Sequence, residues 1–425
     1  MSKIDELIAQ YCPNGVEYKK LWEVTAWDKR FNGLDKHMQK KVINYPYVLA
    51  NKFKELELEK GNVRLLSTGN YIGWTTEELA GNNLCEGEIV AIPGGGKANV
   101  KYCKGKFVTA DNRIATSLDT NLLLNKFLYY WMLINNDLIE SFYRGSGIKH
   151  PSMKSVLTME IPLPPLPVQQ EIVNILDKFT ELEAELEAEL EARRKQYEYY
   201  RNQLLTPVEV DGKWLMNGVE VEWKTLGEII SALRTGLNPR KNFKLNSVGA
   251  ENYYITVREL NGFSIQVTEK TDRVDNLGLN LIQNRSKIQI GDILFSGTGT
   301  IGRTALVTEV PNNWNIKEGL YVITPITEII NERFLIYIIH SKEVFNRILS
   351  KADGSTVLSI SMSSLQKIPI PIPPLSEQER IVEILDKFEK LVNDISEGLP
   401  AEIEARRKQY EYYRGKLLNF KKLND

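Results

Sequence analysis

The sequence has few of the residues that build disulfides, metal centres and histidine-based active sites. Its 425 residues include three cysteines, Cys12, Cys85 and Cys103, and three histidines, His37, His150 and His340. The cysteines show no metal-ligand spacing, and their sparse use favours a reducing cytoplasm over a compartment where disulfides form. With three scattered histidines, a histidine-rich metal site is not expected.

Long hydrophobic runs are also missing. No apolar stretch approaches the roughly 20 residues of a membrane span. The first residues, Met1–Asp5, lack the basic-then-apolar layout of a signal peptide. We therefore expect a cytoplasmic protein that makes no use of a membrane. A chain of 425 residues is too long for one ordinary core and suits two to four domains.

Two glycine-rich stretches resemble cofactor loops without meeting their requirements. Phe295–Gly302 contains a G-x-G-x-x-G pattern, but Arg303–Thr308 is too rich in β-branched residues and too short before Pro311 to form the helix that must follow. Pro93–Lys97 resembles a phosphate loop, yet Ala98 stands where such a loop has Ser or Thr. Both stretches predict glycine turns between strands, whose backbone and flanking cations can approach a phosphate chain. A plain turn without such a contact is the alternative.

Other catalytic signatures are absent from the sequence. There is no Asn/Asp-Pro-Pro-aromatic methyltransferase motif, no nuclease carboxylate pair with a following lysine, and no helicase motif. Ser146 and Ser355 lie in Gly-Ser segments, but neither lies in the Gly-x-Ser-x-Gly elbow of a serine hydrolase. We therefore do not expect this chain to catalyse a reaction.

The charge is nearly balanced, at −1 overall, but it is unevenly distributed. Six glutamates alternate between Glu181 and Glu191. Pro13–Pro162 holds 20 Lys/Arg against 16 Asp/Glu, and Asn217–Ile372 holds 17 against 15. Mildly positive globular parts joined by acidic helices permit DNA binding without requiring it, and a solvated mixed-charge surface remains an alternative.

The dominant positive feature is a long internal repeat. A proline strap, Pro162–Leu166, precedes an Ile-Leu-Asp-Lys-Phe helix, and both return as Pro371–Leu375 and its following helix. Ala192–Arg201 and Ala405–Arg414 are identical over ten residues, Ala-Arg-Arg-Lys-Gln-Tyr-Glu-Tyr-Tyr-Arg. A repeat of this length, spaced by half the chain, predicts two similar halves.

Each half follows one plan. An Asn-Gly-Val-Glu tag opens it at Asn14 or Asn217, and short β-type runs follow: Tyr45–Leu49, Val63–Ser67, Glu88–Pro93 and Lys106–Ala110, then Tyr253–Val257, Asp292–Ser296, Ala305–Thr308 and Leu320–Ile323. A helix is expected at Asn125–Phe142 and at Asn331–Leu349, each followed by a Gly-Ser loop at Gly145–Met153 or Gly354–Met362. The halves differ between Leu21 and Thr120 and between Leu226 and Ile330. Different loops on one scaffold predict that the two halves do not recognise the same target.

The repeated helices carry one apolar stripe each, which must be buried. The expected interface residues are Ile172, Ile175, Leu176, Phe179, Leu182, Leu186, Leu190 and Tyr197 in the first helix, and Ile381, Ile384, Leu385, Phe388, Leu391 and Tyr410 in the second. Because globular parts alternate with helices, the two helices are expected to pair antiparallel. Packing of each helix on its own domain is the alternative.

The helices differ in one place. Between Phe179 and Ala192 the first copy repeats a Glu-Leu-Glu-Ala tetrad, and the second copy is four residues longer there and contains Gly398-Leu399-Pro400. The Gly-Leu-Pro sequence predicts a break or kink. One tetrad is about 6 Å of helix and about 40° of rotation, so tetrad number is expected to set the spacing of the two halves.

Taken together, these motifs resemble the specificity (S) subunit of type I restriction–modification systems. The resemblance rests on the Ile-Pro-x-Pro-Pro-Leu-x-x-Gln straps with Gln169 and Gln378, the Ile-Leu-Asp-Lys-Phe helices, the duplicated Arg-Arg-Lys-Gln-Tyr box and the Asn-Gly-Val-Glu tags. It implies an α+β fold with two β-rich globular target recognition domains separated by two long antiparallel coiled-coil helices, duplicated with pseudo-two-fold symmetry. The implied domains are a short helix at 1–12, recognition domains at 13–160 and 207–369, and conserved helices at 161–206 and 370–425.

The resemblance also implies function and partners. Each recognition domain would read half of a bipartite, asymmetric target in double-stranded DNA. Two methyltransferase (M) subunits, which carry S-adenosylmethionine, and the restriction (R) subunits would do the chemistry, and this chain would hold no cofactor or metal. We expect DNA contacts on the glycine turns and Gly-Ser loops, at Lys97, Lys101, Lys104, Arg144, Lys149, His150, Arg234, Arg240, Arg258, Thr298, Arg303 and Lys317.

Two alternatives remain open. The chain could be an S-like subunit of a type IIB-like enzyme, or an adaptor that uses β-rich domains and a coiled coil to join proteins. The target sequence cannot be read from the chain, because no residue-to-base code applies to loops of unknown shape.

Overall fold

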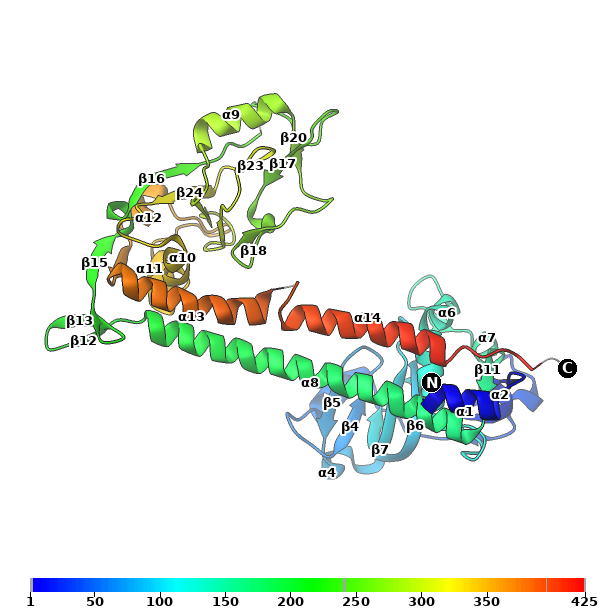
Figure 1. Ribbon diagram of the computed structural model, residues 1–425. Helices are drawn as coiled ribbons and strands as arrows, with labels where there is room; N and C mark the ends of the chain where they lie inside the picture. Colours follow the sequence, from blue (N-terminus) through cyan, green and yellow to red (C-terminus); the bar gives the residue numbers. More distant parts are fainter. Residues whose placement is uncertain (1–2, 240–241, 395, 424–425) are drawn as a thin grey trace. The chain divides into compact units, whose positions relative to one another are not determined.

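The computed structural model describes residues 3–239, 242–394 and 396–423. The chain divides into two compact units. Unit 1 comprises Met1–Glu185 together with Ala405–Asp425, and unit 2 comprises Leu186–Glu404. Each unit therefore contains one globular domain and parts of both repeated helices (Figure 1).

Unit 1 is built around one mixed sheet. The strands of unit 1 are β1 (Glu17–Lys20), β2 (Thr25–Asp28), β3 (Val42–Ile43), β4 (Val63–Leu66), β5 (Ile72–Thr75), β6 (Cys85–Pro93), β7 (Lys101–Thr109), β8 (Asn112–Ser117), β9 (Tyr143–Arg144), β10 (His150–Pro151) and β11 (Glu160–Leu163). Its short helices are α1 (Lys3–Tyr11), α2 (Leu21–Val24), α3 (Ala50–Phe53), α4 (Glu77–Ala80), α5 (Asn125–Ile134), α6 (Asn136–Ser141) and α7 (Met153–Leu157), with 3-10 turns η1 (Lys36–Gln39), η2 (Lys54–Leu56) and η3 (Gly81–Asn83). Seven strands form the sheet in the order β3-β2-β8-β6-β7-β4-β5.

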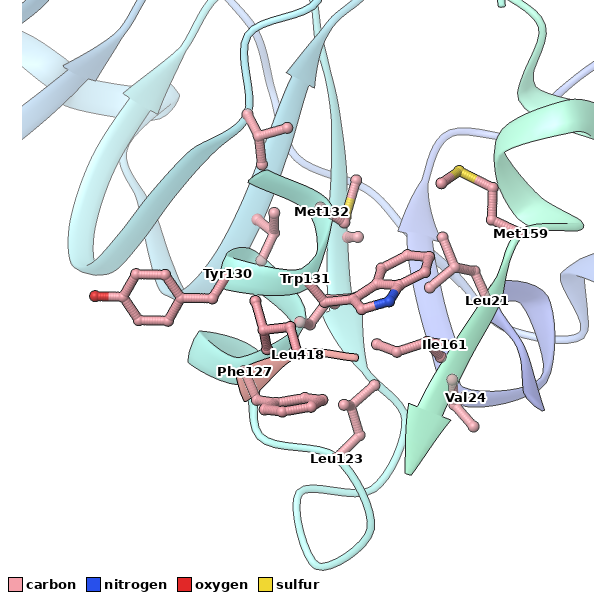
Figure 2. Packing of buried hydrophobic residues seen from close by; sticks show 14 of the residues in the cluster. Leu21, Val24, Leu123, Phe127, Tyr130, Trp131, Met132, Met159, Ile161 and Leu418 are labelled. Atoms are coloured by element: carbon pink, nitrogen blue, oxygen red, sulfur yellow. The ribbon is translucent and has the colours of Figure 1, made fainter. Parts of the chain in front are cut away.

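The core of unit 1 lies where α5 packs on this sheet and on the start of the long helix. Figure 2 shows Phe127 and Trp131 of α5 close to Ile161 of β11 and Leu418. Phe127 and Ile161 are fully buried. Leu418, which follows the C-terminal repeat helix, is thus part of the core of the first globular domain.

The C-terminal tail is bound to the start of the chain in the same unit. The amide of Val16 donates to the carbonyl of Lys421 at 2.9 Å, and the amide of Leu423 donates back to the carbonyl of Val16 at 2.9 Å. A Cβ on Gly15 would lie 2.5 Å from the Lys421 carbonyl oxygen, so only glycine permits this approach. The Asn-Gly-Val-Glu tag at Asn14 is therefore the docking point of the tail.

Unit 2 has smaller sheets and an extra helix. Its strands are β12 (Val208–Val210), β13 (Lys213–Met216), β14 (Val219–Glu220), β15 (Glu222–Thr225), β16 (Ile230–Thr235), β17 (Asn252–Ile255), β18 (Leu260–Asn261), β19 (Ser264–Ile265), β20 (Arg273–Val274), β21 (Ile293–Ser296), β22 (Thr304–Leu306), β23 (Trp314–Ile316), β24 (Leu320–Pro325) and β25 (Pro369–Ile372). Its shorter helices are α9 (Asn276–Ser286), α10 (Glu332–Ile339), α11 (Lys342–Ser350) and α12 (Met362–Gln366), with 3-10 turns η4 (Leu226–Glu228) and η5 (Val257–Glu259). The two main sheets have the orders β16-β24-β21-β22 and β20-β17-β23.

A shared scaffold surrounds these different sheets, which confirms the predicted duplication. In both units the strand after the Asn-Gly-Val-Glu tag pairs antiparallel with the proline strap, β1 with β11 and β15 with β25. A helix pair, α5–α6 or α10–α11, then a short helix, α7 or α12, precede each strap. The predicted α+β class with β-rich domains and long helices is confirmed.

The long helices are α8 (Leu166–Leu205), α13 (Leu375–Asn393) and α14 (Leu399–Leu417). The predicted break is confirmed, because α13 ends before Gly398-Leu399-Pro400 and α14 begins at Leu399. Among the described residues, no helix has the length and apolar character that a membrane crossing requires.

Some sequence-based expectations were wrong in detail. Tyr45–Leu49 forms no strand and makes only a single bridge from Tyr47 to Thr109. The helix expected at Asn125–Phe142 is two helices, because the Asn135 side chain caps α5 by donating to the Trp131 carbonyl at 2.8 Å. The helix expected at Asn331–Leu349 is also two, because the Ser341 hydroxyl caps α11.

Candidate nucleic-acid interface

In unit 1 a glycine turn and the Gly-Ser loop meet. The turn Gly94–Gly96 follows β6, and the amide of Gly96 donates to the carbonyl of Lys149 at 2.8 Å. The Nδ1 of His150 lies 2.6 Å from the carbonyl oxygen of Gly94. A Cβ on Gly94 would lie 2.4 Å from the Asp111 carbonyl oxygen, so this close approach requires glycine. The sequence-predicted turn and loop therefore form one surface.

Unit 2 repeats the arrangement with different residues. The turn Gly297–Gly299 follows β21, and the amide of Gly299 donates to the carbonyl of Leu358 at 2.8 Å. The amide of Ile360 donates to the carbonyl of Gly297 at 2.9 Å, and Thr298 forms an antiparallel bridge with Ser359. The two domains thus place a glycine turn against a Gly-Ser loop in the same way, although the sheets beneath them differ.

A cleft of about 590 Å³ lies beside the turn in unit 2. Three residues predicted to contact DNA, Arg258, Thr298 and Lys317, line it. Asn238, Thr256, Asp272 and Glu318 also line it, so the cleft presents both hydrogen-bond donors and acceptors. The edges of base pairs in the major groove present the same mixture of groups.

The charges in this cleft are partly paired already. Arg258 donates to Asp272 at 2.8 Å, although the Arg258 side chain is 59% exposed. Asn238 donates to Glu318 at 3.0 Å. The Nε of Arg258 also donates to the Thr256 hydroxyl at 3.3 Å and lies 4.0 Å from the Glu259 carboxylate. Because a guanidinium has five N–H donors, this exposed side chain retains donors for a ligand.

Most of the predicted residues in unit 1 are exposed, and one is not. Lys97, Lys104, Arg144, Lys149 and His150 are at the surface. Lys101 is 5% exposed, and its ammonium donates to the Ser67 carbonyl at 2.6 Å. Burial lowers the pKa of Lys101 to about 8. This lysine serves the packing of β7, because its charged end points into the protein.

Two predicted arginines in unit 2 have internal partners. Arg234 pairs with buried Asp292 at 3.1 Å, and desolvation raises the pKa of Asp292 although this arginine and other donors oppose the shift. Arg303 is exposed and donates to the Val257 carbonyl at 3.2 Å. Arg240 lies outside the described residues. Arg234 is therefore held inside the fold, whereas Arg303 lies near the glycine turn.

Sequence reasoning missed several polar residues of the cleft. Asn238, Asp272 and Glu318 belong to no recognised motif, although Asn238 directly precedes Pro239. The Asn-Pro pair does signal a turn, and that was the available clue that a loop lies here.

The repeated helices pair within each unit through aromatic rings. In unit 1 Phe179 of α8 lies 6.1 Å from Tyr410 and 5.7 Å from Tyr413 of α14, between ring centroids. Glu183 of α8 accepts from Arg407 of α14 at 2.6 Å. Rising numbers on α8 meet falling numbers on α14, so the pair is antiparallel.

In unit 2 the same contact is made by the other copies. The rings of Tyr197 and Tyr200 of α8 stack on Phe388 of α13 at 6.3 and 5.5 Å. Burial raises the pKa of Tyr197 to about 12. The identical Tyr-Glu-Tyr-Tyr boxes thus serve first as packing surfaces for the phenylalanine of the opposite copy.

The predicted interface residues divide into two kinds. Ile172, Leu176, Ile381 and Leu385 are fully buried in the domain cores, and Ile175 and Ile384 are partly buried. Leu182, Leu186 and Leu190 are half-buried, and Leu391 is 37% exposed. The first turns of each long helix therefore pack on the adjacent domain, and helix–helix packing dominates further along.

No metal centre is evident in the part of the chain that the structure describes: no group of three His, Cys, Asp or Glu side chains there is placed to hold an ion. All three cysteines are buried and free. The glycine turns, the Gly-Ser loops and the exposed cations beside them suit hydrogen bonding and charge contact with a ligand.

Comparison with known proteins gives consistent results. The family model described as "Type I restriction modification DNA specificity domain" matches residues 13–192 and 218–405. The "Type I restriction enzyme EcoR124I/EcoR124II specificity subunit" of Escherichia coli is 36% identical over 319 residues, which are 73% of this chain and 74% of that protein. S.HindORF215P of Haemophilus influenzae, also named as a type I restriction enzyme specificity subunit, is 35% identical over 79% of this chain and 83% of its own length.

Solved structures share the fold. The S subunit of a type I restriction–modification system from M. genitalium has a TM-score of 0.55 and 17% identity, covering 95% of this chain and 96% of that one. A chain from a study of "complex assembly" and "conformational transition of the type I R-M system" has a TM-score of 0.55 and 16% identity, covering 96% of this chain and 98% of that one.

Proposed function

We propose a function for this chain from the premise that it belongs to the type I restriction modification DNA specificity family. The chain reads the sequence of double-stranded DNA and performs no catalysis itself. Each of its two domains, residues 13–160 and 207–369, recognises one half of a bipartite target. The observation that carries this proposal is the duplicated surface in which a glycine turn meets a Gly-Ser loop beside exposed cations.

The exposed cations suit contact with the phosphate backbone. In unit 1 Lys97 follows the turn, the Lys149 carbonyl accepts from its Gly96 amide, and Arg144 pairs in register with His150. In unit 2 the Arg303 carbonyl accepts from the amide of Ser296, which precedes the turn. Phosphate contacts of this kind fix the position of a protein on DNA without reading its sequence. The amides of Gly96 and Gly299 donate within the fold, so the side-chain cations supply the proposed phosphate contacts.

The cleft of unit 2 suits contact with base edges. Arg258 and Lys317 can donate to guanine, and Asn238 can both donate to and accept from adenine. The acids Asp272 and Glu318 accept from cytosine amino groups or hold the cations in place. Because the sheets beneath the two surfaces differ, the two half-sites differ, and the whole target is asymmetric.

Membership of the family supports the partners that we propose. Two methyltransferase subunits, which bind S-adenosylmethionine, dock near the conserved helices at residues 161–206 and 370–425, and restriction subunits join for cleavage. This chain directs both activities to the target and holds no cofactor. The exposed Tyr199 and Tyr412, which have the same place in the two copies, are available to such partners.

The test is DNA binding by the complex of this chain with its methyltransferase partner. The target is first identified by mapping N6-methyladenine in a host genome with and without this chain. The complex should then shift a duplex that carries both half-sites, with an affinity that falls as salt rises. A duplex with one half-site scrambled should bind far more weakly. Equal binding to all sequences would contradict the proposal.

The duplex shift separates the adaptor alternative, and a cleavage assay of the complex separates the type IIB-like alternative. An adaptor protein would bind unrelated proteins and show no sequence-selective shift. An S-like subunit of a type IIB-like enzyme would show the shift, but its complex would cleave beside the target and on both sides of it.

A further inference from the structure

A fully buried glutamine ties the first domain to its long helix. The Oε1 of Gln169, in the first turn of α8, accepts from the amide of Leu124 at 2.9 Å. Its Nε2 donates to the carbonyls of Leu122 and Pro164, each at 2.8 Å. Leu124 is the N-cap of α5, so one side chain joins the domain helix, the proline strap and the long helix.

The second domain is tied in the same way. The Oε1 of Gln378 accepts from the amide of Asn331 at 2.9 Å, and Asn331 is the N-cap of α10. Its Nε2 donates to the carbonyls of Ile329 and Pro373 at 3.0 and 2.9 Å. Every bond of Gln169 has its counterpart here. The glutamine of each strap is therefore the buried link between domain and helix.

A second link lies eight residues further along each helix. In unit 1 Asp177 of α8 accepts from the ammonium of Lys126 at 2.8 Å and from the hydroxyl of Tyr130 at 2.6 Å, both on α5. In unit 2 Asp386 of α13 accepts from Arg333 at 2.6 Å and from the hydroxyl of Tyr337, both on α10. We call these two groups the aspartate triads.

The hydroxyls of the triads stay protonated at neutral pH. Burial, together with the hydrogen bond to Asp177, raises the pKa of Tyr130, and burial with the bond to Asp386 raises that of Tyr337. Each phenol is therefore a permanent donor to its carboxylate. The cations differ, lysine in one triad and arginine in the other, while the geometry is kept.

Two contacts on one helix restrict its orientation relative to the domain more than a single contact does. Eight residues span about 12 Å of helix, so the glutamine fixes the start of the helix and the triad fixes its direction relative to the domain. Each ion pair is partly exposed, with side-chain exposures of 33% and 34% in unit 1 and 28% and 40% in unit 2. Ion pairs with such exposure add little stability, which points to orientation as their role.

We infer that the aspartate triads are positioning groups that hold each recognition domain at one angle on its long helix and so make the chain discriminate the length of DNA between the half-sites. This inference rests on the proposed function. A domain that swings on its helix can reach half-sites at several spacings, whereas a domain fixed at two points reaches one.

The test uses the full chain in complex with its methyltransferase partner and a plasmid library in which the spacer between the two half-sites varies in length. The variants are Asp177→Ala and Asp386→Ala. The matched controls are Lys178→Ala and Lys387→Ala, which change an exposed neighbour on the same helix; Lys387 pairs only with Glu383 among the interactions described for it. Methylation is read by sequencing, and folding is checked by thermal melting.

The preference for the native spacer over spacers one base pair longer or shorter should fall about tenfold in the Asp variants, equivalent to about 1.4 kcal/mol. Recognition of each half-site sequence should stay the same, and the control variants should match the wild type. Lys126→Arg, which installs the cation of the other triad, should keep the preference. An unchanged spacer preference in folded Asp177→Ala and Asp386→Ala complexes overturns the inference.

Phenylalanine variants cover the case in which an alanine variant does not fold. If an alanine variant does not fold, Tyr130→Phe and Tyr337→Phe take its place, because they remove one hydrogen bond and keep the ring. A preserved preference in both phenylalanine variants then overturns the inference. If the wild-type complex selects no sequence at all, the proposed function itself has failed, and this is seen before any variant is compared.

Discussion

The ring of Tyr413 stacks on the ring of Phe179 with centroids 5.7 Å and planes 26° apart. In the other unit Tyr200 stacks on Phe388 at 5.5 Å and 27°. The two contacts anchor α8 to α14 within unit 1 and to α13 within unit 2. The stretch of α8 between Phe179 and Tyr197 carries the Glu-Leu-Glu-Ala tetrads, so the number of tetrads sets the length of helix between the anchors.

Deletion of one tetrad, Glu181–Ala184, should shift the spacing of the half-sites. It shortens α8 by about 6 Å and rotates it by about 40°, and 6 Å is close to two base pairs at about 3.4 Å each. Genome-wide mapping of N6-methyladenine should then show the same two half-sites with a spacer shorter by about two base pairs. Methylation at the old spacing would contradict the role of the tetrads.

Gly398, between α13 and α14, should not tolerate a side chain. A Cβ there would lie 2.5 Å from the Lys390 carbonyl oxygen and 2.7 Å from that of Asp394. Gly398→Ala should therefore lower the free energy of unfolding by about 1–3 kcal/mol, as overpacking does. Chemical denaturation measures the change. Gly415→Ala is the control, because a Cβ at that position would meet no atom within 4 Å beyond its chain neighbours and the backbone of its own helix. Equal losses in both variants would refute the steric account.

Asp28 predicts a pH dependence of stability. Burial raises its pKa from 3.8 to about 6, although the Ile114 amide donates to it at 2.7 Å. The folded state therefore binds this proton more tightly than the unfolded state does, and the contribution of Asp28 to stability falls as pH rises from about 4 to about 6. At about 1.4 kcal/mol for each pH unit between the two pKa values, the total loss is on the order of 3 kcal/mol.

Asp28→Asn should remove this loss. Asparagine keeps an oxygen acceptor for the Ile114 amide and cannot ionise, so the variant should gain stability over the wild type above pH 6 and little below pH 4. Denaturation at a series of pH values compares the two proteins. A parallel pH profile for wild type and variant would show that Asp28 is not the group responsible.

The scaffold could be predicted because its sequence motifs occur twice in the chain. The straps and the Ile-Leu-Asp-Lys-Phe helices recur after 209 residues, and the tyrosine boxes recur after 213. Their apolar steps of three and four residues are local signals of a helix. The Gly-Leu-Pro break is local in the same sense. Stacking of Phe179 on the tyrosines of the opposite copy follows from that pattern once the helices pair antiparallel.

The recognition sheets could not be predicted because their pairings are not local. In unit 1, β2 pairs in parallel with β3, and β4 pairs in parallel with β7. Parallel pairs are not joined by a hairpin, so no turn motif in the sequence predicts them. Helix α9 was missed because it has no apolar stripe: Leu277 and Leu281 are 75% and 45% exposed. Its start did have a signal, since Asp275 caps it by accepting from the Gly278 amide.

The sequence indicated two kinds of loop as the candidate site, but it did not show which of their residues are exposed. Glycine turns and Gly-Ser loops were chosen together, and the two kinds of loop do meet in each unit. Individual cations could not be sorted, because burial depends on long-range packing. Lys101 is buried and Lys149 exposed, although both occur beside glycine-rich loops.

These two lysines give a direct test of which cations face DNA. Lys149→Ala removes an exposed charge on the Gly-Ser loop, so the plot of log affinity against log salt should become less steep by about 1, the change for one lost phosphate contact. Lys101→Met removes an ammonium that donates to the Ser67 carbonyl inside the fold, so the slope should not change even if stability does. Titration of the target duplex with the methyltransferase complex at several salt concentrations measures both slopes. A reduced slope for Lys101→Met together with an unchanged slope for Lys149→Ala would mean that DNA approaches a different face of the domain.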